Sequence, residues 1–399
     1  MSGFLRGILI ALIGLAGLGA VVWWSIGPDW RAFLSNPPME RDVLFWSQQQ
    51  RENGFRMLDE AGFIIKSRKI PQGEAVKELP QGDPLTLPLD LDAYFDDNQM
   101  AAVVVLHDGK IRLEKYGLRF NADGRWTSFS VAKSLTSTLL GAAIKDGYIK
   151  SLDDKVTDYV EGLAGSPYDD VSLAQLLSMT SGVDWDEDYE DKNSDVARFL
   201  SHKPEGDTPQ IVSYMQGLGR AHAPGAEWNY STGETNLIGI VVVNAINKSL
   251  AEYLSEKIWA PYGMEQQASW LIGDDGLEIS GCCIQAATRD FARFGQFVLE
   301  GGEIAGESIV PEGWFDTATT KQADIGFPGH GYGYQWWTYD SGAFTARGIF
   351  GQGIFIDPAR KLVIASNANW TSARGEPGGE AEAREAFYKT VQAAIDAEQ

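Results

Sequence analysis

Residues 126–134 read WTSFSVAKS, and they join two reactive side chains to the start of an apolar helix. Ser130 and Lys133 form the pattern S-x-x-K, and the apolar spacing up to residue 146 predicts a helix that ends at Gly147. Side chains three residues apart share one helix face, so the Lys133 amine can reach the Ser130 hydroxyl. If burial lowers the pKa of that amine, it can act as a base towards the serine. The pattern therefore predicts a nucleophilic Ser130 that is activated by Lys133.

The same stretch offers a place to stabilise negative charge. A serine in the first turn of a helix has a backbone N–H without an intrahelical partner, and it lies in the positive end of the helix field. That N–H can donate to a developing oxyanion. The alternative is a serine that only caps the helix beside an exposed lysine, which is a common arrangement for these residue types.

Competing catalytic patterns are missing from the sequence. No G-x-S-x-G segment predicts an α/β-hydrolase, and neither a P-loop nor a dinucleotide-binding glycine pattern occurs. The four histidines, His107, His202, His222 and His330, have no local sequence that suggests a catalytic base, although a Ser-His-Asp triad assembled at a distance remains an alternative. Without a CxxC or HExxH pattern, the sequence predicts no metal site and no cofactor.

Two later segments add candidate site residues. In WNYSTG at residues 228–233, the phenol of Tyr230 could relay a proton between Ser130 and a leaving group. In FTARGIFGQG at residues 344–353, glycines within a strand pattern indicate either a close approach of ligand or backbone, or a bend in the sheet. An edge strand here could supply a second oxyanion N–H and bind an extended acyl group.

Composition and charge narrow the class of protein. The 399 residues include 13 Trp, 18 Phe and 14 Tyr, which is enough apolar area for a folded body. The formal net charge of -22 argues against nucleic-acid binding, because such a field repels phosphates. Cys282 and Cys283 are adjacent, and neighbouring cysteines rarely bridge, so two small buried thiols are expected.

The N-terminal sequence predicts a membrane anchor. Residues 7–26 carry no charge and are long enough to span a bilayer as a helix. Arg6 precedes this segment, and Trp23 and Trp24 stand at its far end, where an interfacial aromatic belt would fall. With Arg6 on the inner side, the body is expected on the periplasmic or extracytoplasmic side. The alternative is a cleaved signal peptide and a secreted body, although no A-x-A site is evident.

The remaining pattern predicts an α+β fold. Strand patterns at both ends suggest one antiparallel sheet built from the two chain ends, flanked by helices and carrying an inserted helical region. The expected units are an anchor at 1–30, an extension at 31–95 that wraps the body, and a catalytic domain at 96–399 whose residues 152–285 are mainly helical. The expected strands are 101–106, 110–116, 331–339, 343–349, 353–356 and 361–366, and the expected helices are 39–60, 130–146, 235–247, 287–300 and 380–397.

Taken together, these segments resemble the serine β-lactamase and penicillin-binding superfamily. Within it they are most similar to the β-lactamase-related hydrolases that include 6-aminohexanoate-dimer hydrolases and family VIII esterases. The resemblance runs from about residue 45 to the C-terminal helix, and it implies a β-lactamase/transpeptidase-like fold. It is carried by WTSFSVAKS at 126–134, LLSMTSG at 176–182, YST at 230–232, ATRDFARFG at 287–295, YGYQWW at 332–337 and GQ at 351–352.

The resemblance implies the parts of an acyl-transfer site. By it, Ser130 is the residue that is acylated, and Lys133 and Tyr230 share the general acid–base work. The backbone N–H groups of Ser130 and Ile349 are implied to form the oxyanion hole.

Three residues are expected to contact a small-molecule substrate. Arg347 and Gly348 resemble the end of the third family motif, which reads K-T-G in β-lactamases. Tyr189 resembles a substrate-contacting tyrosine of the 6-aminohexanoate-dimer hydrolases, and a plain loop tyrosine is the alternative.

Two departures from the family pattern bear on the substrate. Thr232 stands where the second motif has asparagine, and Ala346 stands where a β-lactamase has the lysine that meets a penicillin carboxylate, a role Arg347 could take. Both changes favour an amide or ester hydrolase. The alternatives are a DD-peptidase or β-lactamase acting on cell-wall peptides or β-lactams, and a tethered binding module without activity. Oligomeric state is not predicted.

Overall fold

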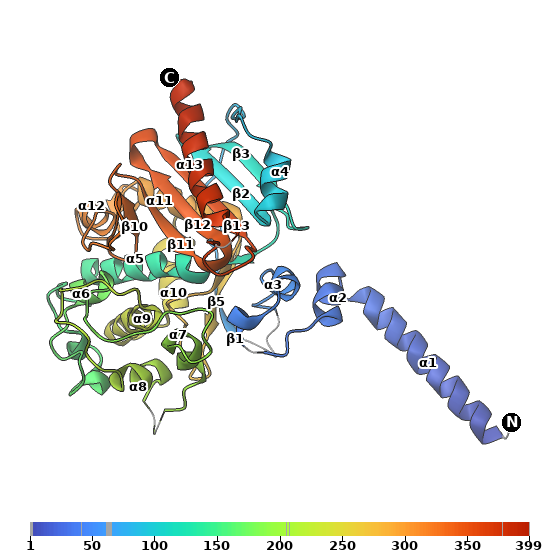
Figure 1. The fold of residues 1–399 in the computed structure, drawn as a ribbon. Coiled ribbons are helices and arrows are strands. Elements are labelled where there is room, and N and C mark those ends of the chain that lie inside the picture. Colours follow the sequence, from blue (N-terminus) through green and yellow to red (C-terminus); the bar gives the residue numbers. More distant parts are fainter. Residues whose placement is uncertain are drawn as a thin grey trace.

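The fold centres on a seven-stranded antiparallel sheet that both ends of the chain build (Figure 1). The computed structural model describes residues 3–40, 42–60, 66–204, 206, 208–376 and 378–398. The strand order is β3-β2-β13-β12-β11-β10-β9, so an early hairpin lies beside the last strand, which confirms the predicted sheet. The strands are β2 (Met100–His107), β3 (Lys110–Tyr116), β9 (His330–Tyr332), β10 (Trp337–Tyr339), β11 (Phe344–Gly348), β12 (Gln352–Asp357) and β13 (Leu362–Ala368).

Helices cover both faces of this sheet, which explains the unbroken apolar run of β2. Val103 and Val105 pack in a cluster with α13, whereas Val104 and Leu106 pack in the cluster that contains α5 and α11. Successive strand residues point to opposite faces, so a strand covered on both sides needs apolar residues throughout. The covering helices are α5 (Ala132–Lys145), α11 (Thr288–Leu299) and α13 (Glu380–Ala397).

A mainly helical region packs on α5 away from the sheet (Figure 1). Its longest helix, α9 (Thr232–Ile246), runs beside α5, and the two helices share the same apolar cluster. Ser231 caps α9 by accepting from the N–H of Glu234. The other elements of this region are η3 (Val156–Asp158), η4 (Glu161–Leu163), α6 (Leu173–Leu177), α7 (Asp195–Arg198), η5 (Phe199–Ser201), α8 (Gln210–Gln216), α10 (Leu250–Leu254) and η6 (Ser255–Trp259).

A second, four-stranded sheet was not predicted, and it leads straight into the S-x-x-K segment. Its order is β1-β5-β6-β4, and β4 ends two residues before Phe129. These strands are too short for a clear sequence pattern, since two of them have three residues or fewer. The strands are β1 (Lys66–Ile70), β4 (Trp126–Thr127), β5 (Ala268–Ile272) and β6 (Ile284–Ala286).

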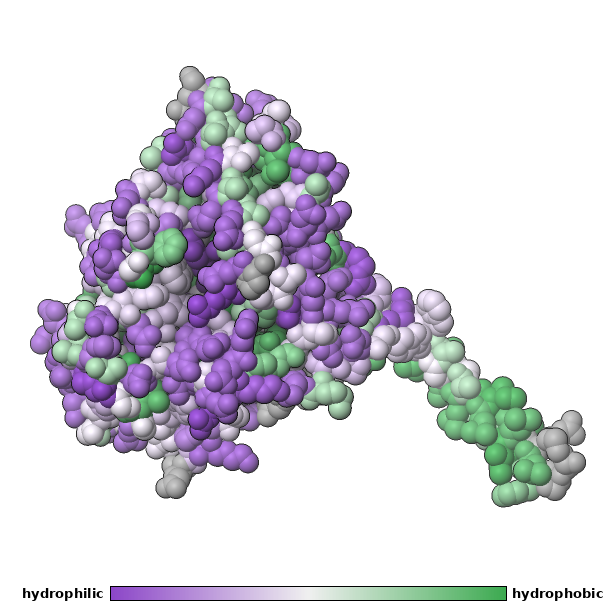
Figure 2. Space-filling model, in the orientation of Figure 1, coloured by the Kyte–Doolittle hydropathy of each residue, from purple (hydrophilic) through white to green (hydrophobic). Residues whose placement is uncertain are grey.

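The N-terminal apolar helix, α1 (Gly3–Ser25), projects away from the body (Figures 1 and 2). Residues Gly7–Ser25 form a 19-residue candidate membrane span with a mean hydropathy of 2.2, and none of it is buried in the body. The side chain of Arg6 lies outside the described part. In Figure 2 this helix is green, whereas the body is mostly polar on the face that is shown.

A docked second helix, α2 (Pro28–Ser35), connects this span to the body. Phe33 of α2 is 1% exposed and packs with Met57. Arg56 forms a 3.3 Å ion pair with Asp29, and the Asn53 amide donates to the Ala32 carbonyl.

Two predicted elements are broken in the structure. Within the described residues of the range 39–60, the expected helix is reduced to η1 (Val43–Phe45) and α3 (Gln48–Gly54), because Ser47 starts a new helix with a capping box. The expected strand 331–339 is split into β9 and β10 by a turn in which Gln335 has a φ of 65°. Short elements complete the fold: α4 (Leu91–Asp97), β7 (Glu303–Ile304), β8 (Glu307–Ser308), α12 (Trp314–Ala318), η7 (Ile349–Gly351) and η8 (Pro358–Arg360).

Candidate active site

Ser130 lies in η2 (Phe129–Val131), directly before α5, and it is 9% exposed. Ser128 fixes this approach, since its N–H donates to the Ile284 carbonyl (2.8 Å) and its hydroxyl accepts from the Ile284 N–H (2.9 Å). Phe129 has a φ of 42°, a left-handed conformation that costs energy for a bulky residue. Such strain persists only where the surroundings hold it, and it clusters at functional sites.

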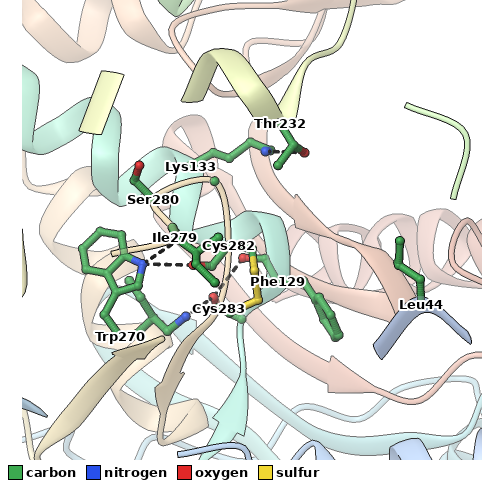
Figure 3. The surroundings of a disulfide bond; sticks show 12 residues. Leu44, Phe129, Lys133, Thr232, Trp270, Ile279, Ser280, Cys282 and Cys283 are labelled. Atoms are coloured by element: carbon green, nitrogen blue, oxygen red, sulfur yellow. Dashed lines mark hydrogen bonds between the residues drawn. A yellow bond between two sulfur atoms is a disulfide. The ribbon is translucent and has the colours of Figure 1, made fainter. Parts of the chain in front are cut away.

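Lys133, three residues after Ser130, is buried and is 1% exposed. Its ammonium donates to the Thr232 hydroxyl oxygen at 2.9 Å (Figure 3). The same nitrogen lies 5.3 Å from the centre of the Tyr230 ring. Burial lowers the pKa of Lys133 to about 8, and the nearby negative charge of Glu187 opposes this shift. At pH 7 roughly a tenth of the Lys133 amine is therefore neutral, and the neutral amine can accept a proton.

Glu187 is a site residue that sequence reasoning missed. Its carboxylate accepts from the Thr232 N–H (2.9 Å), the Thr232 hydroxyl, the Tyr189 phenol (2.9 Å) and the Trp185 indole N–H. Lys133, Thr232 and Glu187 thus form a continuous hydrogen-bonded chain. Glu187 stands in a loop of acidic residues, and such a run normally indicates a solvated surface, so no pattern in the sequence singles it out.

The hydroxyl of Thr232 replaces the amide that the family motif places there. It accepts from Lys133 and donates to Glu187, which an asparagine side chain could also do through its two ends. The departure at this position therefore keeps a polar partner for the lysine.

Tyr230 is held by a cage of aromatic rings. Its ring stacks on Trp337 at 5.5 Å and meets Tyr332 edge-on at 6.1 Å. Burial, followed by the charge of Glu187, raises the pKa of Tyr230 well above its ordinary value, and a hydrogen bond from the Ser130 side chain acts against that rise. The phenol is therefore protonated at neutral pH, and it lies within hydrogen-bond reach of the Ser130 side chain.

Gln335 ties together the segments that carry these residues. Its carbonyl accepts from the Ser134 hydroxyl of α5 (2.7 Å), and its side-chain oxygen accepts from the Thr235 hydroxyl of α9 (2.7 Å). Its amide donates to the Leu177 carbonyl at 2.7 Å. One buried residue, 2% exposed, thus links α5, which follows Ser130, to α9, which follows the Tyr230 loop.

The end of β11 lies against the Ser130 segment, as the oxyanion-hole expectation requires. A Cβ on Gly348 would lie 2.5 Å from the Ser128 carbonyl oxygen, so only glycine permits this approach. The following residue, Ile349, packs in the same apolar cluster as Phe129. Gln352 supports this turn by donating to the carbonyls of Ile349 (3.1 Å) and Phe350 (3.1 Å).

The structure does not support Arg347 as a substitute for the family lysine. Its guanidinium donates to Glu385 of α13 (2.8 Å) and to the Tyr339 phenol (2.6 Å), and it lies over the Trp337 ring. The positive charge of Arg347, which a substrate carboxylate would need, is therefore already paired within the protein. Ala346 is 1% exposed in the main apolar cluster and offers no polar group to a substrate.

Tyr189 and Arg374 lie next to each other beside this centre. The Arg374 guanidinium is 5.7 Å from the centre of the Tyr189 ring, and the Tyr189 phenol donates to Glu187. Burial raises the pKa of Tyr189, and the charge of Glu187 adds to this effect. The structure thus places Tyr189 against Glu187 and against Arg374, an exposed cation that was not predicted, and a substrate contact of Tyr189 stays a prediction.

The adjacent cysteines are bonded, which corrects the expectation of two free thiols. Cys282 and Cys283 form a disulfide, and the turn that contains them lies beside Phe129, Lys133 and Thr232 (Figure 3). The prediction was wrong because it relied on the general rarity of disulfides between neighbouring cysteines. In this turn the backbone is unusual, since Cys283 has a positive φ of 79°.

The four histidines all have partners outside this centre. His107 contacts Arg112, His202 contacts Ser213, and His222 pairs with Glu227, while His330 contacts the Pro328 carbonyl. The described geometry therefore brings no histidine to Ser130.

Comparison with known proteins assigns the chain to a family. Residues 92–387 match the Beta-lactamase family, and this span is most of the chain. The chain belongs to that family and is a serine hydrolase. It is 29% identical over 297 residues to 6-aminohexanoate-dimer hydrolase of Paenarthrobacter ureafaciens, covering 70% of this chain and 75% of that protein. It is 27% identical over 173 residues to a β-lactamase of Pseudomonas fluorescens, covering 41% and 44% of the two chains.

Solved structures show the same fold. A candidate 6-aminohexanoate-dimer hydrolase from Bacillus anthracis superimposes with a TM-score of 0.75 at 24% identity, covering 88% of this chain and 95% of that one. A family VIII carboxylesterase gives a TM-score of 0.57 at 18% identity, covering 73% and 95%. The expected β-lactamase/transpeptidase-like architecture is thereby confirmed.

Proposed function

We propose that this hydrolase cleaves amide or ester bonds of small molecules through an acyl-enzyme on Ser130. The observation that carries the proposal is the buried Lys133, whose pKa of about 8 makes it a base and whose ammonium contacts Thr232 and lies near the Tyr230 ring. A lysine that only covered a helix surface would be exposed and would keep its ordinary pKa.

The proposed reaction proceeds in two steps. The Ser130 oxygen attacks the carbonyl carbon while its proton passes to the neutral amine of Lys133. The backbone N–H groups of Ser130 and Ile349 stabilise the oxyanion. Tyr230 donates its proton to the leaving amine or alcohol and regains one from Lys133 as the carbon–leaving-group bond breaks. Water then attacks the acyl-serine ester with the same groups in reversed roles, and it releases the acid and restores Ser130.

Two features of the site favour open-chain substrates over β-lactams. Ala346 supplies no cation, and Arg347 is already paired with Glu385. The exposed guanidinium of Arg374, beside Tyr189, is placed instead to attract an anionic end of a substrate. The relative from Paenarthrobacter ureafaciens, named for an amide dimer, supports the same substrate class.

We further propose that the body lies outside the cytoplasm and is held at the membrane by residues 7–26. The unburied apolar span and the docked α2 support an anchor, and a signal sequence would have the same composition. The Cys282–Cys283 disulfide supports an oxidising compartment, because the cytoplasm keeps thiols reduced.

A substrate panel on the detergent-solubilised full chain tests the proposed function. We expect a fluorophosphonate to label Ser130, identified by peptide mass, and we expect turnover of p-nitrophenyl esters and short amides. Among matched esters, those with a terminal carboxylate should react faster than those with a terminal ammonium. Nitrocefin turnover, or stable acylation by fluorescent penicillin without ester turnover, would instead favour the β-lactamase or DD-peptidase alternative. Absence of labelling would refute the proposal.

Replacing Glu187 by glutamine should move the pH profile to lower pH. The negative charge of Glu187 raises the pKa of Lys133, so its loss lowers that pKa and leaves more neutral amine in acid. We expect the acidic limit of kcat/KM, near pH 8 in the wild type, to fall by up to about one pH unit. The measurement is kcat/KM for one ester, determined between about pH 5 and about pH 10.

The control for this prediction is Glu190→Gln, which removes an exposed charge from the same loop and should leave the limit unchanged. A limit that stays in place, or that rises, in Glu187→Gln would show that Glu187 does not tune the catalytic base.

A further inference from the structure

The disulfide closes a turn that lies between the two halves of the proposed site. Cys283 is 4% exposed, whereas Cys282 is partly exposed and open to solvent reagents. The Trp270 indole N–H holds the turn from behind by donating to the Cys282 carbonyl at 2.9 Å and to the Ile279 carbonyl at 3.0 Å (Figure 3).

One side of this turn supports the nucleophile. The N–H of Cys283 donates to the Phe129 carbonyl at 3.4 Å, and the next residue, Ile284, is joined to Ser128 by two hydrogen bonds. Phe129 holds its left-handed backbone directly before Ser130. The orientation of the Ser130 N–H, which the proposed reaction uses, therefore depends on where Cys283 holds Phe129.

The other side supports the partner of the base. A Cβ on Gly281 would lie 2.9 Å from the Thr232 methyl carbon, and the Gly281 N–H donates to the Asn236 side chain at 3.3 Å. The Ser280 carbonyl accepts from Thr136 of α5 at 2.8 Å. The turn is thus packed through Gly281 against Thr232, which accepts the hydrogen bond of Lys133.

We propose that the Cys282–Cys283 disulfide is a positioning element of the active site, and that its reduction by a dithiol reversibly lowers turnover. This inference rests on the proposed function of Ser130. The dithiol supplies two electrons and two protons, so the sulfur–sulfur bond becomes two thiols and the reductant becomes a cyclic disulfide. Without the bond, the two cysteines can adopt separate backbone conformations, and the turn no longer holds Phe129 and Thr232 in one arrangement.

The test compares the oxidised, reduced and reoxidised full-length protein in detergent. Thiols are counted by alkylation and mass, and kcat, KM, the fluorophosphonate labelling rate of Ser130 and the melting temperature are measured for each state. We expect no free thiol in the oxidised protein and two after dithiothreitol. We expect kcat and the labelling rate to fall about 10- to 100-fold on reduction, with a smaller change in KM, and to recover on reoxidation.

The double variant Cys282→Ser/Cys283→Ser is the matched control, and its activity should be low and insensitive to dithiothreitol. If this variant does not fold, the comparison of oxidised and reduced wild type alone tests the inference.

Two free thiols in the oxidised protein, or a reduced protein whose kcat is within twofold of the oxidised value, would overturn the inference. A loss of kcat that occurs only with loss of the melting transition would also overturn it, because the bond would then be a general stabiliser. Absence of labelling before reduction refutes the proposed function itself, whereas equal labelling in both states refutes the positioning role alone.

Discussion

Ser130→Ala is expected to lower kcat/KM for ester and amide hydrolysis by about 10⁴-fold or more, with complete loss of fluorophosphonate labelling. The serine oxygen is the atom that forms the acyl bond in the proposed reaction, and no other group can replace it. The substitution removes one oxygen from a largely buried position and keeps the backbone N–H that stabilises the oxyanion. The measurement is a comparison of purified wild type and variant on one activated ester, with labelling followed by intact mass.

The matched control is Ser137→Ala on the same helix. The Ser137 hydroxyl is buried and has no hydrogen-bond partner among the described residues, so its loss should not lower stability and should leave kcat/KM within twofold. Residual labelling of Ser130→Ala at the wild-type rate would place the nucleophile elsewhere and would refute the proposed site.

Lys133→Met is expected to lower kcat by about 10³-fold while the protein stays folded. Methionine has a similar length and fills the same buried space, but it cannot accept the serine proton. Because a buried ammonium is replaced by an apolar side chain, we expect the melting temperature to stay the same or to rise. The measurements are kcat, KM and thermal melting, together with the pH profile, which should lose its acidic limit near pH 8.

Lys145→Met, an exposed lysine at the end of the same helix, serves as the control and should be as active as the wild type. A Lys133→Met protein that kept activity within tenfold, with the same pH profile, would assign the base to another group.

The parts of the fold that could be predicted are those with long or repeated patterns. The expected helix 380–397 matches α13 (Glu380–Ala397), and the run at 101–106 lies within β2. The second sheet was missed because its strands are short and gain their partners from distant parts of the chain, so local pattern carries little information. The break at Gln335 was missed for a similar reason, since its backbone is fixed by contacts with α5, α9 and Leu177.

The candidate site could be predicted only where a short motif placed residues on one element. Ser130 and Lys133 follow from spacing on a helix. Tyr230 was singled out from its own segment and then supported by resemblance to a family, whereas the assignment of Ile349 came from that resemblance; the roles of all four remain predictions. Glu187 is hydrogen-bonded to Thr232, which is far away in the sequence, and no local sequence pattern indicates that contact. The bonded cysteines were misjudged because their conformation depends on the turn around them.

Because β2 pairs with β13, the main sheet cannot be completed until late in the synthesis of the chain. Val104 pairs with Ala365, so the central strands meet only after almost the whole chain has been made. Closing such a long loop costs entropy before any contact repays it, and sheets with distant partners form slowly. Until then, the apolar β2 hairpin has an unpaired edge that can bind other nascent chains. We therefore expect products of premature termination before β13 to aggregate, and chaperone demand to peak late in translation.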